Sequence, residues 1–278
     1  MALYNVASTL NPLVKKLRIQ WDGELFDLNR FAIGACKAKT ENFDAVIYVC
    51  GPLHPPVAQF LLQFQQSIRI GVGISQVGDF TPSDCLDVFH LRDSDTESSF
   101  DLALANIGYP HLAAAPLHKT AEIATCLVGK QSEYGDLDGH NSALKVVNSL
   151  VAEVSAISVQ TLLHQKFATP YVNEIALQAG RVLLTTRMHA SLIGLFHRIP
   201  VLSIDQIRGS AKVTRMMTKI GYPVFNIWET STEELQAVLY RLSRRTEPSS
   251  DRKWRHRIIK QSRLALRDSI ATIVKAVS

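Results

Sequence analysis

Short apolar runs alternate with segments of helical spacing in the first third of the chain. Residues 45–50 (AVIYVC) form a β-rich run that is expected to stop at Gly51-Pro52, and residues 57–66 follow with helical spacing. Residues 68–74 and 86–91 are two more short apolar runs and are predicted to be buried strands. This order of strand, glycine turn, helix and strand is typical of an α/β protein.

The same alternation resumes in the middle of the chain. The pattern predicts strands over residues 125–128, 156–159, 182–185 and 201–204, and helices over residues 141–154, 171–179 and 190–196. Strands that are separated by helices pair in parallel, in a sheet that is covered on its faces. The middle of the chain is therefore expected to be a second α/β unit.

Together the two series predict two Rossmann-like halves with a cleft between them. We place the N-terminal half at residues 1–115, the C-terminal half at residues 116–240 and a basic helix at residues 241–278. Ligands of open parallel sheets bind beyond the carboxyl ends of the strands. Gly51 and Ser75, which follow the first two strands, are therefore candidate substrate-binding residues. The nearby Gly71-x-Gly73 lacks the third glycine of a dinucleotide motif, so it indicates close backbone packing.

The end of the chain is unusually basic. Residues 241–278 contain 11 Lys or Arg and 3 Asp or Glu, in a chain whose formal net charge is +5. Apolar residues recur at helical spacing from Ile259 to Val277, which predicts a helix with one apolar and one basic face. The basic face is either a solvated surface or a contact for an anionic partner. Among such partners we expect the surface of a membrane and no nucleic acid.

Composition narrows the class of protein. Hydrophobic residues make up 46% of the chain and charged residues 20%, as in soluble globular proteins. The four cysteines form no C-x-x-C pair, so we expect buried thiols and neither a zinc site nor a disulfide framework. No apolar run approaches the roughly 18 residues of a membrane span. A cytoplasmic protein is expected, with peripheral contact at the inner face of the membrane through its tail.

The segment from Val182 to Asp205 carries the clearest candidate chemistry. It places Thr185, Thr186, Arg187 and His189 at a strand-to-helix turn. Free N–H groups at a helix start, together with a guanidinium, can bind a phosphate or a carboxylate. His189 adds a group that can donate or accept a proton near neutral pH. The alternative is that Arg187 and His189 only hold the loop in place.

This segment resembles the C-terminal signature of the polysaccharide pyruvyl transferase family. The likeness rests on Thr186-Arg187-Met188-His189, on a helix of small and apolar residues, on Arg198-Ile199-Pro200-Val201 and on Ala211-Lys212-Val213. It continues upstream through Cys50-Gly51-Pro52-Leu53, Ile70-Gly71-Val72-Gly73-Ile74 and Val88-Phe89-His90-Leu91-Arg92-Asp93, which are similar to the family's strands and turns. The resemblance covers roughly residues 44–230.

The resemblance implies a GT-B-like fold and a role in polysaccharide biosynthesis. Phosphoenolpyruvate would be the donor and a sugar or lipid-linked glycan the acceptor, with a pyruvate ketal as product. No metal and no separate cofactor are expected. Arg187 and Thr186 would bind one anionic group of the donor, Arg92 or Lys212 the other, and His189 would act as general acid or base. The other readings are that Arg92 pairs with its neighbour Asp93 and that Lys212 lies solvated in a polar loop.

Two other functions remain open. A GT-B glycosyltransferase that uses a nucleotide sugar would share the same two-domain frame, because a fold does not determine a function. A non-catalytic glycan-binding relative is the other alternative, because residues 1–40 contain no clear counterpart of the family's N-terminal loop. Binding of phosphoenolpyruvate but not of UDP or GDP would favour pyruvyl transfer.

Overall fold

The chain divides into two compact units. The computed structural model describes residues 43–76, 81–105, 121–152, 154–158, 180–244 and 252–277. Unit 1 comprises Met1–Ala105 and Gln261–Ser278, and unit 2 comprises Asn106–Lys260. The last helix is therefore divided between the units, whereas the charge pattern alone sets residues 241–278 apart.

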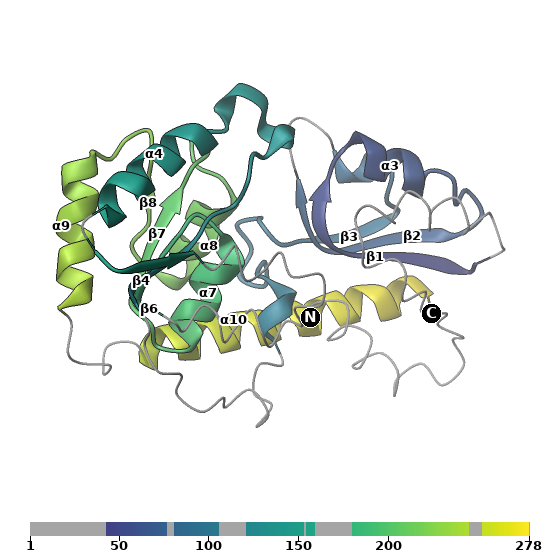
Figure 1. Ribbon diagram of the computed structural model, residues 1–278. Helices are drawn as coiled ribbons and strands as arrows, with labels where there is room; N and C mark the ends of the chain where they lie inside the picture. Colours follow the sequence, from purple (N-terminus) through teal and green to yellow (C-terminus); the bar gives the residue numbers. More distant parts are fainter. Residues whose placement is uncertain are drawn as a thin grey trace. The chain divides into compact units, whose positions relative to one another are not determined.

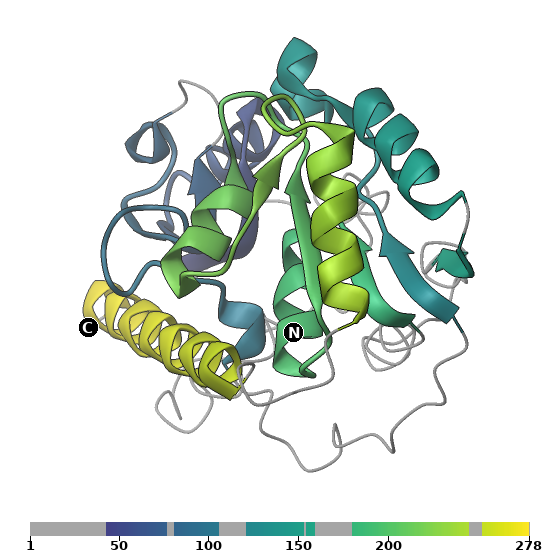
Figure 2. The ribbon, with the colours of Figure 1, turned by 90° about the vertical axis from the view of Figure 1, so that its left-hand side faces the viewer.

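Helices and strands alternate along both units, as Figures 1 and 2 show. The strands are β1 (Ala45–Leu53), β2 (Ile68–Gln76), β3 (Val88–Leu91), β4 (Ala121–Cys126), β5 (Ala156–Ser158), β6 (Gly180–Thr185), β7 (Val201–Asp205) and β8 (Phe225–Asn226). The α-helices are α3 (Pro55–Leu61), α4 (His140–Val151), α7 (Met188–Phe196), α8 (Lys212–Ile220), α9 (Thr232–Ser243) and α10 (Arg252–Val277). Short 3₁₀ helices lie at Pro82–Asp84, Leu102–Leu104 and Ser132–Leu137.

Unit 1 contains a three-stranded parallel sheet in the order β1-β2-β3. Its core packs Leu53, Ile74 and Leu86 of the sheet region against Val57 and Leu61 of α3. The expectation that the first strand stops at Gly51 is wrong, because β1 keeps pairing with β2 as far as Leu53. The strand bends at this point instead of ending, with φ values of 54° at Cys50 and 133° at Gly51.

Close packing explains the two glycines of β2. A Cβ on Gly71 would lie 2.6 Å from Leu86 Cδ1, and one on Gly73 would lie 2.7 Å from Leu102 Cδ1. Gly73 also has a φ of 64°, which side chains rarely allow, at an irregularity in the β2–β3 pairing. The interpretation of Gly71-x-Gly73 as a packing feature is therefore confirmed.

Unit 2 contains a five-stranded parallel sheet in the order β5-β4-β6-β7-β8. Helices α4 and α9 contact each other on one face, where Val147 and Leu239 pack against Val182, Leu184 and the neighbouring strands. Helix α7 contacts β6 and β7, helix α8 contacts β7, and the two helices contact each other. Since alternate residues of a strand point to opposite faces, β7 buries Leu202 toward α9 and Ser203 toward α7.

Two elements of unit 2 differ from the sequence expectations. Residues from Lys212 onward form helix α8 and not a polar loop. The carboxylate of Asp205, which lies outside this helix, caps its N-terminus, because it accepts hydrogen bonds from the N–H groups of Ala211 and Thr214 at 2.8 and 3.0 Å. The hydrophobic pattern also does not predict β8, which is only two residues long. The helix expected over residues 171–179 lies outside the described residues.

Helix α10 has the two faces that its sequence predicts. Ile258, Ala265 and Ile273 are completely buried, whereas Lys260 and Arg267 are exposed. Within unit 1 the helix is attached to β3 through Ser269 Oγ, which lies 3.2 Å from His90 Nδ1. None of the helices in the described residues is both long and apolar enough to cross a bilayer.

The predicted fold class, an α/β chain with two parallel sheets, is confirmed by these elements. The cleft between the two halves stays a prediction.

Candidate functional site

The candidate site lies at the carboxyl edge of the sheet in unit 2, where β4, β6 and β7 end. Strand β6 ends at the buried Thr185, and the buried Thr186 follows it directly. Thr185 Oγ1 donates a hydrogen bond to Cys126 O at the end of β4 and accepts one from Arg187 N at 3.0 Å. The turn after β6 is thereby held against the end of the neighbouring strand.

Three side chains hold the loop that follows β4. Arg187 Nε donates to Leu127 O at 3.0 Å, and Thr186 Oγ1 accepts from Val128 N at 2.9 Å. Gln206, just after β7, donates from Nε2 to Gly129 O at 3.4 Å. Successive residues of one loop are thus each bound from the ends of β6 and β7. Thr186 has a structural contact here, and its predicted role in substrate binding stays a prediction.

Arg187 is fixed at one nitrogen and open at the others. Its side chain is exposed, and Nε is the guanidinium nitrogen that the fold uses. Among the described residues, the two terminal nitrogens of this guanidinium have no hydrogen-bond partner. A guanidinium held in this way presents a planar pair of donors, which matches the geometry of a carboxylate or a phosphate.

The start of α7 adds main-chain donors beside this guanidinium. Arg187 is the N-cap residue and has no side-chain capping bond, and the first intrahelical bond runs from Ser191 N to Arg187 O. The N–H groups of Met188 and Ala190 in the first turn have no partner among the described residues. His189, the second residue of α7, is exposed. A helix start with open N–H groups favours negative charge.

Lys212 lies at the same edge of unit 2, as the first residue of α8, and is half-buried. The sheet therefore brings Thr186, Arg187, His189 and Lys212 to one edge of one unit. Gly51, Ser75 and Arg92 belong to unit 1.

In unit 1, Arg92 is 5% exposed and is surrounded by acceptors. Its guanidinium donates to Asp93 Oδ1 at 3.0 Å, to Asp101 Oδ2 at 3.3 Å and to Ser75 Oγ. Burial alone would lower the pKa of Arg92, but the two carboxylates outweigh it and the pKa is raised. These contacts give Arg92 and Ser75 a structural role. Their predicted roles in substrate binding remain predictions.

Gly51 also has a structural reason for its identity. A Cβ at this position would lie 2.5 Å from Tyr48 Oη, which donates to Pro52 O at 3.3 Å. Burial raises the pKa of Tyr48 to about 12, so its hydroxyl stays protonated at neutral pH. A substrate contact of Gly51 is not needed to explain the glycine.

An exposed tryptophan beside the site was missed by the sequence reasoning. Trp228 is 38% exposed, and its indole N–H donates to Gln206 O at 3.0 Å. The guanidinium carbon of Arg208 lies 4.1 Å from the centre of its ring. A Cβ on Gly139 would lie 2.9 Å from Trp228 Nε1, so glycine is required there. The signal in the sequence that could have identified Trp228 is the presence of a tryptophan in a polar segment next to the end of a strand.

Gln206 connects this tryptophan to the loop beside Arg187. Its main-chain oxygen binds Trp228, and its side-chain amide binds Gly129 O and Asp138 Oδ1, the latter at 2.6 Å. The side-chain oxygens of Gln206 and Gln131 are buried and have no protein partner among the described residues. An ordered water is the usual partner of such atoms. No group of three or more His, Cys, Asp or Glu that could hold a metal occurs within the described ranges.

Comparison with known proteins gives no family. No family model matches the sequence, and no curated protein matches it. Among solved structures, the chain is similar to one described as "Crystal Structure Analysis of the Glycotransferase of kitacinnamycin", with a TM-score of 0.39 and 13% sequence identity. The similarity covers 76% of this chain and 55% of that one, so this chain spans about half the length of that protein. A similarity this low is not evidence of a shared activity.

Proposed function

We propose that this protein is a transferase that binds phosphoenolpyruvate at the carboxyl edge of unit 2 and forms a pyruvate ketal on a sugar. The observation that carries the proposal is the guanidinium of Arg187, which is fixed through Nε and has no partner at its two terminal nitrogens among the described residues. The open N–H groups of Met188 and Ala190 lie in the adjoining helix turn. An anionic ligand can use both sets of donors at once.

The choice of donor rests on the resemblance of residues 186–213 to pyruvyl transferases. Phosphoenolpyruvate carries a carboxylate and a phosphate on a three-carbon skeleton. In the proposal, Arg187 and the start of α7 bind one of these groups. Lys212, the next cation of the motif along the chain, is the candidate for binding the other group. Arg92 is left out of this proposal because its donors are already used by Asp93, Asp101 and Ser75.

The reaction requires a proton donor and a site that binds the phosphate as it leaves. A proton is added to the C3 methylene, which becomes a methyl group, and a sugar hydroxyl adds to C2. The C2–O bond to phosphate then breaks, and a second hydroxyl of the same sugar closes the ketal. His189 is the proposed general acid toward C3 or base toward a hydroxyl, since it stands exposed in the first turn of α7.

Thermal unfolding in the presence of candidate donors tests the proposal. We expect phosphoenolpyruvate to raise the unfolding temperature and UDP or GDP not to raise it. Arg187→Lys keeps the positive charge but loses the paired donors. The apparent affinity for phosphoenolpyruvate, measured from this stabilisation, should therefore fall at least about tenfold. Arg181→Lys, an exposed arginine at the start of β6, is the matched control. Equal affinities in both variants would show that Arg187 does not bind the donor.

One observation favours a second candidate, a glycosyltransferase that uses a nucleotide sugar. Trp228 exposes part of an aromatic ring at the same edge as Arg187, and aromatic rings stack on nucleobases. In that case UDP or GDP would stabilise the protein and phosphoenolpyruvate would not, and Trp228→Ala would remove the effect. Stabilisation by neither ligand, together with binding of a glycan, would indicate the non-catalytic relative.

A further inference from the structure

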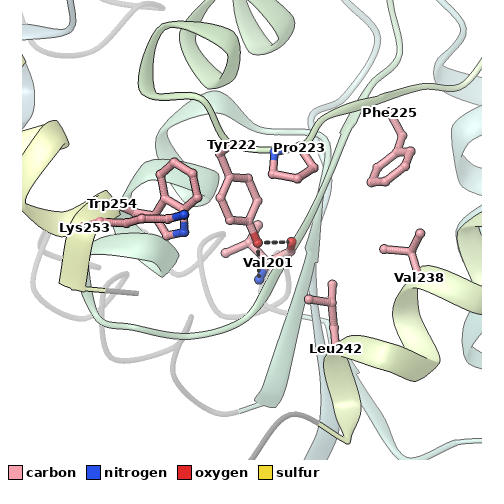
Figure 3. Close-up of a pocket in the computed structure, with 8 residues that line it drawn as sticks. All are labelled: Val201, Tyr222, Pro223, Phe225, Val238, Leu242, Lys253 and Trp254. Carbon is pink, nitrogen blue, oxygen red and sulfur yellow. Dashed lines mark hydrogen bonds between the residues drawn. The ribbon is translucent and has the colours of Figure 1, made fainter. Parts of the chain in front are cut away.

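An apolar hollow lies at the opposite, amino edge of the sheet in unit 2. It has a volume of about 170 Å³, and its walls include Val201 at the start of β7, Val238 and Leu242 of α9, and Tyr222 and Trp254 (Figure 3). Tyr222 Oη donates to Val201 O at 2.7 Å, and the rings of Tyr222 and Trp254 meet edge to face with 5.4 Å between their centres. The walls are therefore held in place before any ligand binds.

Exposed cations lie on the elements that form this hollow, and we name Arg241, Arg244, Lys253 and Arg257 the basic rim. Lys253 is itself part of the wall, whereas Arg241 and Arg244 flank the wall residue Leu242 in the sequence, and the Arg244 guanidinium lies 4.2 Å from the centre of the Tyr240 ring. The ammonium of Lys253 lies 4.2 Å from the centre of the Trp254 ring. Arg257 Nη1 donates to Ile220 O at 2.8 Å, and its guanidinium lies 5.4 Å from the same ring.

In the part of the chain that the structure describes, the segments that form the hollow contain no carboxylate. Residues 198–204, 219–226, 238–244 and 252–260 together hold nine Lys or Arg and no Asp or Glu. Basic residues at the ends of α8 and α9 complement the helix dipoles, which explains some of them. Arg257 donates to the last carbonyl of α8 and complements the dipole of that helix, but helix dipoles do not explain Lys253 in the first turn of α10, where a positive charge is unfavourable.

We propose that this edge of unit 2 binds the surface of a membrane that contains anionic phospholipid. The basic rim attracts the headgroups, and the hollow receives the apolar part of a lipid. This combination of an apolar centre and a cationic border is the one that interfacial membrane-binding segments use. A nucleic acid or a soluble anion would use the cations and leave the apolar hollow without a function.

The proposal places the contact at the beginning of α10 and not along the whole basic tail. Beyond Lys260 the helix belongs to unit 1, where Arg263 Nε donates to Ala105 O at 3.5 Å and Arg267 pairs with Asp268 at 3.0 Å. These later cations are exposed but lie outside the hollow. They therefore supply a matched control on the same helix.

Co-sedimentation with lipid vesicles tests the proposal on the full chain. The vesicles consist of phosphatidylcholine, with or without phosphatidylglycerol. We expect binding to the anionic vesicles only, weakened by salt. Reversal of Arg241, Arg244 and Lys253 to Glu should lower the affinity at least about a hundredfold, because each basic residue near such a surface contributes severalfold. Reversal of Arg263, Arg267 and Lys275 to Glu should change it much less.

A second measurement tests the hollow itself. Vesicles with brominated acyl chains should quench the fluorescence of the wild-type protein, and the quenching should disappear in Trp254→Phe if that variant still sediments with vesicles. The membrane proposal is overturned if neither vesicle type is bound, if the two triple variants lose equal affinity, or if brominated chains quench nothing. If the wild-type protein binds duplex DNA but no vesicles, and the rim variant loses the DNA binding, this edge is a nucleic-acid surface instead.

Discussion

After the end of β6, Arg187 uses one guanidinium nitrogen for the fold, and its two terminal nitrogens have no partner among the described residues. Arg92 in unit 1 uses its guanidinium for Asp93, Asp101 and Ser75. The two arginines look alike in sequence, since each follows a predicted strand. What distinguishes them in the structure is the number of acceptors that the described residues place around each guanidinium.

His189 gives the first residue-scale prediction. His189→Ala should leave the free energy of unfolding within about 0.5 kcal/mol of wild type, because the side chain is exposed. Turnover of phosphoenolpyruvate should fall by about 10²–10⁴-fold, the usual contribution of a general acid or base. Phosphate release is the measurement, and His256→Ala, another exposed histidine of unit 2, is the control. An unchanged turnover would exclude His189 from the chemistry.

Cys50 gives a prediction about pH. Burial and the nearby Asp101 raise the pKa of its thiol from 9.0 to about 12. A raised pKa means that the folded state keeps its proton while the unfolded chain loses it above pH 9, so the contribution to stability is complete below pH 9 and declines as pH rises toward 12. At pH 10 the loss is about 1 kcal/mol. Urea unfolding at pH 8 and pH 10 measures it.

The comparison for this prediction is Cys50→Ala, which removes the titrating thiol and keeps a small apolar side chain. Its free energy of unfolding should fall less between the two pH values than that of wild type. Tyr48, whose pKa is also raised to about 12, chiefly by burial and secondly by Cys50, keeps the burial part of its contribution in both proteins. Equal slopes for the two proteins would contradict the assignment to Cys50.

At the scale of the elements, the end of β7 determines where α8 begins. Asp205 is 1% exposed, and its Oδ2 accepts from Ala211 N, Thr214 N and Thr214 Oγ1 within 3.0 Å. The N-cap residue, Ala211, cannot supply this acceptor itself. The carboxylate of the last residue of a strand thus both closes a loop and caps the next helix.

Asp205→Asn tests this assignment. The amide keeps the shape but replaces one acceptor oxygen with a donor, and the negative charge is lost, so donors of the loop or of α8 are left unpaired. The free energy of unfolding should fall by about 1–3 kcal/mol in urea. Glu229→Gln, an exposed change of the same type in the same unit, should have little effect. A stable Asp205→Asn protein would mean that another group caps α8.

At the scale of the whole molecule, α10 belongs to both units. Its residues up to Lys260 are part of unit 2, and its residues from Gln261 are part of unit 1. In unit 1 these residues bury Ala265, Ile270 and Ile273. The three-stranded sheet of that unit is small, so its stability should depend on the end of a helix that is nearly two hundred residues away in the chain.

Ile273→Asp tests this dependence. A carboxylate at a position that is 0% exposed should cost unit 1 about 3–5 kcal/mol. Hydrogen exchange should show lost protection in β1, β2 and β3 and retained protection in β4, β6 and β7, because unit 2 has its own core. Ala271→Asp, at an exposed position of the same helix, is the control. Equal loss in both sheets would show that the units unfold together.

Much of the fold could be predicted because its signals are local. The buried strands β2, β6 and β7 are short apolar runs, and α4 and α10 repeat apolar residues at helical spacing. The pattern failed at α8, because the N-cap residue, Ala211, supplies no acceptor, and the carboxylate that accepts from the helix start belongs to Asp205, seven positions before the first helical residue. It also failed at β8, because two residues are too few to show a period.

The candidate site was predictable only in part. The residues Thr186, Arg187 and His189 were found because they follow an apolar strand and begin a helix. Trp228 and Gln206 were missed, because what connects them to the site is a chain of hydrogen bonds across β4, β6, β7 and β8. No spacing in the sequence reports such bonds.

The sequence alone determined the α/β class, the order of most strands and helices, and the two-faced tail, because each depends on the periodicity of neighbouring residues. Tertiary structure decided which cations are open and which are used, which glycines are required by packing, and where the basic tail meets an apolar hollow. These properties depend on residues that are far apart in the chain. A side chain's partners are known only when the fold has brought them together.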